Sequence, residues 1–135
     1  MNLAEVIQNL SWLAIIVAAL STFMIGGLWY SVFEKPWMAA NNFTNEDLKK
    51  RKMPVVFGLS FFFAFLMSLN LSMFIGKEDL AYGTIAGFLT GFGWVALGIA
   101  IIALFENRPL KYFLINGGYL TVSFTLMGAI LGAWK

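Results

Sequence analysis

The chain has 135 residues, of which 60% are hydrophobic and only 12% are charged, and its formal net charge at pH 7 is +2. A soluble domain carries charge on about a quarter of its residues, so the composition excludes a soluble domain and indicates a surface that mostly faces lipid. The sequence contains no cysteine and no histidine, which excludes disulfides and removes the usual protein ligands of zinc and haem. We therefore expect no metal site and no cofactor. The small net charge also argues against nucleic-acid binding.

Four long uncharged segments divide the chain. A helix needs about 20 mostly apolar residues to cross the hydrocarbon core of a bilayer, and each segment reaches that length. The first is expected to begin almost at the N-terminus, with Asn2 as its N-cap and Glu5 as the reciprocal partner. We therefore expect an all-α integral membrane protein, a four-helix transmembrane bundle in which residues 1–135 form one domain. The predicted transmembrane helices cover residues 6–33, 53–75, 80–105 and 111–134.

The first connection, residues 34–52, is the only long one, and it carries the signals of a short helix. Thr44 is a suitable N-cap, and Glu46 and Asp47 follow it as acidic residues of a first turn. The basic run at residues 49–52 places cations at the other end. We expect a short loop helix between the first two spans, with the basic run touching anionic lipid.

Basic residues are distributed unevenly between the two ends of the predicted bundle. Cytoplasmic loops of membrane proteins carry an excess of lysine and arginine. The first and third loops are therefore expected to be cytoplasmic, with both termini outside. The two loops at one end hold seven basic residues, namely Lys35, Lys49, Lys50, Arg51, Lys52, Arg108 and Lys111, whereas the other end holds two, Lys77 and Lys135.

Each predicted span carries small residues at four-residue spacing, which places them along one helix face. Such faces let helix backbones approach closely in lipid. The third span contains a clear example in Gly83, Gly87 and Gly91. Two uses of this face are open: packing within the chain, or contact with a second copy in a homo-oligomer.

Asp, Glu, Lys and Arg are absent from the interior of the spans, which argues against proton-coupled transport. A few polar or unusually placed aromatic residues form a candidate intramembrane site. By depth, Trp94 and Tyr119 are expected to meet near the midplane, and Asn70 is expected to seek a partner on another helix. These residues either make interhelical hydrogen bonds and ring contacts or line a small apolar ligand cavity. The candidate set is Asn70, Trp94, Asn116 and Tyr119.

A second candidate site gathers aromatic and charged residues at the cytoplasmic rim. An aromatic belt at the membrane surface explains Trp29 and Tyr30, whereas Trp37, which follows a proline, indicates a chain that folds back along the interface. The charged residues at the same level are expected to close the mouth of the bundle, either as a binding site or as an ion-pair clamp. The candidate set is Trp29, Tyr30, Glu34, Trp37, Glu106 and Arg108.

The order of several motifs resembles the small bacterial membrane proteins grouped as the domain of unknown function 1761 family. The resemblance covers nearly the whole chain. It implies a four-span protein of the bacterial inner membrane, with no established activity, substrate or catalytic residue. The motifs are Gly27-Leu28-Trp29-Tyr30-Ser31, Trp37-Met38, Phe105-Glu106-Asn107-Arg108-Pro109, Gly118-Tyr119 and Gly128-Ala129-Ile130-Leu131-Gly132-Ala133-Trp134.

These features favour a small non-enzymatic membrane protein that self-associates and binds membrane lipid, a hydrophobic small molecule or a partner protein. The alternative is a small-solute transporter or channel that acts as an oligomer, without proton coupling through an intramembrane carboxylate. That alternative requires a polar path, and the spans offer few polar residues to line one. An enzyme is the least favoured class, because the sequence contains no visible nucleophile–base pair or metal constellation.

Overall fold

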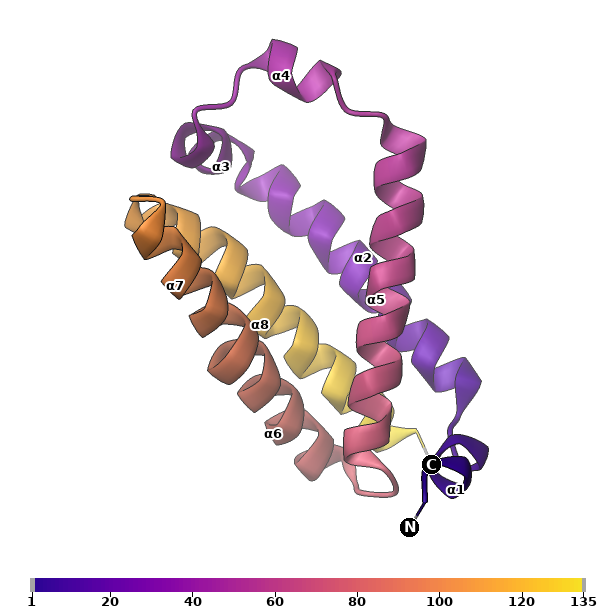
Figure 1. Ribbon diagram of the computed structural model, residues 1–135. Helices are drawn as coiled ribbons and strands as arrows, with labels where there is room; N and C mark the ends of the chain where they lie inside the picture. Colours follow the sequence, from indigo (N-terminus) through magenta and orange to yellow (C-terminus); the bar gives the residue numbers. More distant parts are fainter. Residues whose placement is uncertain (1, 135) are drawn as a thin grey trace.

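The computed structural model describes residues 2–134 and places most of them in helices (Figure 1). Lys135, which was counted above among the basic residues, lies outside the described residues. In chain order the elements are α1 (Leu3–Gln8), α2 (Trp12–Val32), α3 (Glu34–Asn41), α4 (Asn45–Lys49), α5 (Met53–Ile75), α6 (Leu80–Thr90), the π-helical η1 (Gly91–Ala96), α7 (Leu97–Phe105) and α8 (Leu110–Ala133).

Four helical segments are long and apolar enough to cross a membrane: α2, α5, the continuous helix formed by α6, η1 and α7, and α8. Large apolar side chains cover the outside of these helices. Met24, Leu104 and Phe105 are 73%, 81% and 86% exposed, respectively. A monomeric soluble protein rarely exposes extended apolar surface, so this surface is suited to lipid. The expected all-α, four-span architecture is confirmed.

The N-terminal segment forms two helices where the sequence suggested one span beginning near residue 6. Asn2 caps α1 by accepting a hydrogen bond from the Glu5 amide at 2.9 Å. Asn9 then ends α1 and donates its side-chain amide to the Glu5 carbonyl at 2.9 Å. Ser11 caps α2 through its hydroxyl. Polar side chains that bond to nearby backbone groups in this way compete with a continuous helix, which explains the break between α1 and α2.

The long connection between α2 and α5 holds two short helices. α4 is the loop helix expected from the sequence, and its Thr44 and Asp47 form a reciprocal capping box. α3 precedes it, with Pro36 in its first turn, where backbone N–H groups have no helical partner and proline is tolerated. Asn42, with φ of 58°, ends α3 in the left-handed conformation. Figure 1 shows α3 turning off the axis of α2 and α4 bridging to α5.

α8 is the central helix, and it contacts each of the other three spans. Its contact with α6 is made through glycine on both sides. A Cβ added to Gly83 or Gly87 would collide with a backbone oxygen of α8, that of Gly128 or of Phe124, respectively. Gly91 continues the same buried face. Of the two uses left open for these three glycines, the structure shows packing against α8 of the same chain.

The buried core lies at the end of the bundle that holds α1 and the α5–α6 turn. There Ser68 of α5 donates a hydrogen bond to the Ile15 carbonyl of α2 at 2.8 Å. None of residues 53–63, the N-terminal half of α5, is buried, and Figure 1 shows this half diverging from α2. The core cluster consists of Ala14, Ile15, Ala18, Leu71, Ile75, Phe124, Met127 and Leu131.

The α6–α8 contact predicts a difference between two glycine substitutions. Gly87→Ala places a methyl group against the backbone of α8, and overpacking of this kind costs about 1–3 kcal/mol of unfolding free energy. Gly98→Ala is the control, because nothing lies within 4 Å of the added Cβ and alanine has the higher helix propensity. Reversible unfolding in mixed detergent micelles measures both. Equal stability of the two variants would contradict the close α6–α8 contact.

Candidate functional site

A cleft of about 530 Å³ lies where α5 diverges from α2. We call it the α2–α5 cleft. It is bounded by α2, α3, the α4 segment, the N-terminal half of α5 and one residue of α8. Its lining residues are Phe23, Gly26, Gly27, Tyr30, Ser31, Glu34, Trp37, Leu48, Arg51, Val56, Phe57, Ser60 and Tyr119.

Two tyrosines on the α8 side of the cleft have hydroxyl groups that are already hydrogen-bonded. Tyr30 donates to Oδ1 of Asn116 at 2.7 Å, and Tyr119 donates to the Thr22 carbonyl at 3.1 Å. The two rings meet edge to face, with centroids 5.2 Å apart. Because both hydroxyl protons are engaged between α2 and α8, the tyrosines offer the cleft mainly their aromatic rings.

Glycine allows the aromatic rings to fit between α2 and α8. A Cβ added to Gly26 would lie 3.0 Å from the Tyr119 hydroxyl, and one added to Gly118 would lie 3.0 Å from the Trp29 ring. Trp29 also donates its indole N–H to the Ile115 carbonyl of α8 at 2.9 Å. Trp29 is therefore a tie between the two helices, and it is not among the residues that line the cleft.

Trp37 forms the α3 side of the cleft. Its ring lies edge-on to Tyr30 at 5.7 Å and to Phe43 at 5.3 Å. The Asn41 side chain donates to the Trp37 carbonyl at 2.9 Å, within α3. These contacts fix α3 against the end of α2, so the expectation that the chain folds back at Trp37 agrees with the geometry.

Two opposite charges stand at the mouth of the cleft. Glu34 lies in the first turn of α3, and Arg51 follows α4. Neither side chain takes part in an ion pair within residues 2–134. Arg51 donates Nε–H to the Leu48 carbonyl at 3.2 Å, which leaves its terminal nitrogens for other partners.

The remaining charged candidates of the rim form a separate pair. Nε of Arg108 lies 3.5 Å from a Glu106 carboxylate oxygen, and the Arg108 guanidinium lies 5.3 Å from the centre of the Tyr112 ring, within cation–π range. Neither Glu106 nor Arg108 lines the α2–α5 cleft. The rim residues expected to act together are therefore divided between the cleft and the α7–α8 turn.

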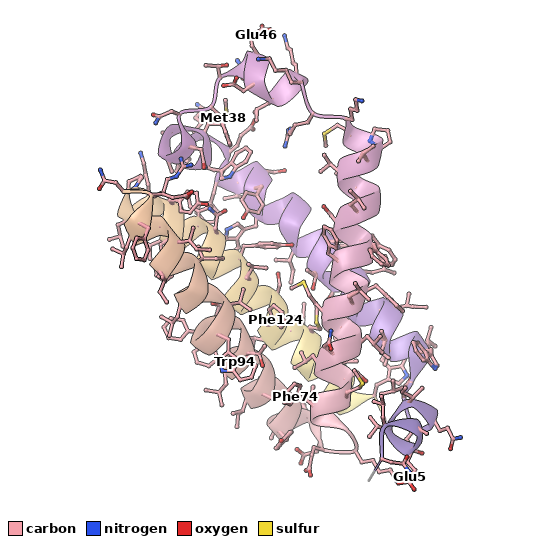
Figure 2. All side chains as sticks on the ribbon, in the orientation of Figure 1. Glu5, Met38, Glu46, Phe74, Trp94 and Phe124 are labelled. Carbon is pink, nitrogen blue, oxygen red and sulfur yellow. The ribbon has the colours of Figure 1, made fainter. Side chains whose placement is uncertain are left out.

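The intramembrane candidates are also divided. Trp94, which is 70% exposed, and Asn70 line a different groove of about 570 Å³ between α5 and α6, where Trp94 lies edge-on to Phe74 at 6.3 Å. The Asn70 amide donates to the Leu66 carbonyl of its own helix at 2.8 Å, not to another helix. Figure 2 shows Trp94 and Phe74 in the half of the bundle away from α3 and α4. Trp94 and Tyr119 therefore do not form the single midplane site that depth suggested.

Several of the residues that line the cleft were not identified from the sequence. Arg51 was interpreted only as part of the basic anchor, and Phe23 and Phe57 resemble ordinary lipid-facing residues. Their rings lie 5.5 Å apart, edge to face, between α2 and α5. The available signal was the pair Gly26 and Gly27, which leaves a side-chain-free strip on α2 at this level.

Comparison with known proteins places the chain in one family. No curated protein and no solved structure matches it. A family model described as "Protein of unknown function (DUF1761)" matches residues 13–132. The matched region includes every residue that lines the cleft. This chain has four helices that are long and apolar enough to cross a membrane, and it belongs to the DUF1761 family of proteins of unknown function.

Proposed function

We propose that this protein is a small non-enzymatic lipid-binding protein that holds one acyl chain in the α2–α5 cleft and the lipid head group at its mouth. The observation that carries the proposal is the polarity gradient along the cleft. The proposal requires only one copy of the chain, because the residues that line the cleft all come from that one chain.

The gradient runs in the direction expected for a membrane lipid. The charged residues Glu34 and Arg51 stand just beyond the ends of α2 and α5, at the level of lipid head groups. From Ser31 to Phe23 the cleft follows α2 inward for about 12 Å, at 1.5 Å per residue. Phe23 and Phe57, whose rings contact each other edge to face, line the part of the cleft that lies farther from the charged residues. A bilayer lipid has the same order of charge outside and hydrocarbon inside.

The chemistry of the lining favours an acyl chain over a polar solute. The Tyr30 and Tyr119 hydroxyls donate to groups on the opposite helix, and the Ser31 hydroxyl donates to the Gly27 carbonyl at 2.6 Å. These three donors are already satisfied, so Ser60 on α5 is the remaining hydroxyl that lines the cleft. The volume of about 530 Å³ lies within the range of about 300–1,000 Å³ typical of ligand sites. This lining supports lipid binding rather than passage of a solute.

We also propose that the cleft opens toward the cytoplasmic leaflet of the bacterial inner membrane. Seven basic residues lie in the two loops at the end of the bundle that holds the cleft, and cytoplasmic loops carry such an excess. The lipid would then enter from the leaflet that faces the cytoplasm.

Lipid retention tests the cleft directly. Gly27 lines the cleft and nothing lies within 4 Å of a Cβ added there, so we expect a leucine side chain at this position to occupy part of the cleft. We expect Gly27→Leu to lower the fraction of protein that retains lipid several-fold in native mass spectra recorded after gentle extraction. Gly58→Leu is the control: its position on α5 is equally open, but it does not line the cleft. If Gly27→Leu retains as much lipid as the control variant, the proposal is wrong.

The orientation is tested by single cysteines, because the natural sequence has none. Glu46→Cys lies on α4 and Lys77→Cys lies in the α5–α6 turn, at opposite ends of the bundle. A membrane-impermeant maleimide should label Lys77→Cys in intact spheroplasts and Glu46→Cys only in inside-out vesicles. The reverse pattern would place the cleft in the outer leaflet.

A further inference from the structure

We infer that the mouth of the α2–α5 cleft selects a zwitterionic phospholipid head group, with its phosphate on Arg51 and its ammonium group on Glu34. This inference rests on the proposed lipid binding and adds the chemical class of the lipid.

The two charges face one opening from different elements. Glu34 is held in the first turn of α3, and Arg51 follows α4. Both line the cleft, yet they are not within ion-pair distance of each other. The ion pairs within residues 2–134 instead join close neighbours, in α4 and around the α7–α8 turn. A ligand that carries both signs of charge can therefore bridge the mouth and satisfy both side chains.

Each side chain suits one half of such a head group. An arginine presents several N–H donors in a planar fork that matches phosphate oxygens. The Nε–H bond from Arg51 to the Leu48 carbonyl holds the base of that fork. Glu34 accepts hydrogen bonds only, and an ammonium group donates three. The two side chains thus carry the charges that complement the phosphate and the ammonium of a phosphoethanolamine group.

The carboxylate gives the mouth its selectivity. An anionic lipid without a cationic group could satisfy Arg51 but would leave its phosphate facing the unpaired negative charge of Glu34. The lysines at positions 49, 50 and 52 are adjacent to Arg51 in sequence, yet none of them lines the cleft. Their attraction for anionic lipid therefore acts at the membrane surface, outside the site where Glu34 and Arg51 meet the ligand.

The test compares two lipids with identical acyl chains, phosphatidylethanolamine and phosphatidylglycerol, titrated into delipidated protein in detergent and followed by native mass spectrometry. The wild-type protein should bind phosphatidylethanolamine about tenfold more tightly than phosphatidylglycerol, which is the effect of one charge-assisted hydrogen bond. Glu34→Gln should remove this preference, mainly because it lowers the affinity for phosphatidylethanolamine. Arg51→Gln should lower the affinity for both lipids. Glu46→Gln, which changes an acidic residue that does not line the cleft, should behave as the wild type.

The possible failures are distinguishable. Equal affinity of the wild type for the two lipids, or a preference that survives Glu34→Gln, overturns the head-group inference and leaves acyl-chain binding intact. A preference for phosphatidylglycerol likewise overturns it. If Gly27→Leu does not reduce the binding of either lipid, the proposed function itself fails. Melting curves of each variant in the same detergent separate loss of binding from loss of fold.

Discussion

The direct backbone contact between α6 and α8 is the interaction on which the rest of the bundle depends. In a membrane, burial of apolar side chains contributes little to helix association, because lipid is equally apolar. Association therefore relies on close packing and hydrogen bonds. Gly83 and Gly87 on α6, together with Gly128 on α8, remove the side chains that would hold the two backbones apart. Gly132 extends the contact to the start of α6, at the Asp79 carbonyl. The resulting hairpin is the platform against which α2 and α5 pack.

The same requirement for small residues explains why α5 packs along only half of its length. Its C-terminal half offers Ala64, Ser68 and Ser72, all buried, and Ser68 bonds to the α2 backbone. Its N-terminal half carries the bulky run at residues 61–63, and no residue before Ala64 is buried. Close approach to α2 is therefore confined to one end. The divergence at the other end creates the α2–α5 cleft, and α3 and α4 bridge the gap.

Periodicity and length predicted which segments are helices, but they did not predict which helices pack against each other. Apolar length predicted the four spans, and the N-cap Thr44 with the acidic residues of the first turn predicted α4, because these signals are local. The spacing of Gly83, Gly87 and Gly91 identified a packing face but could not say whether another helix of the chain or a second copy covers it. Only the three-dimensional arrangement assigns that face to α8.

The candidate site shows the same limit. Tyr30 and Asn116 were both singled out, yet they were assigned to different sites, because no local pattern connects residues so far apart in sequence. Trp94 and Tyr119 were brought together by depth alone. Depth along a helix does not determine the direction in which a side chain points, and these two rings lie in separate hollows. Arg51 could not be distinguished in the sequence from the adjacent lysines, which have the same charge but do not line the cleft.

The apolar character of the cleft is itself a product of helix packing. Its wall contains two tyrosines, which would make it polar if their hydroxyls faced inward. Instead the Tyr30 hydroxyl is bonded to Asn116, and the Tyr119 hydroxyl is bonded to the Thr22 carbonyl. The hydrogen bonds that fasten α2 to α8 thereby engage these two hydroxyl groups and leave the tyrosine rings toward the cleft. Charge enters only at the mouth, from α3 and the segment after α4, which lie beyond the ends of the spans. The scaffold and the site are therefore one arrangement, in which the ties between helices set the polarity that a lipid would meet.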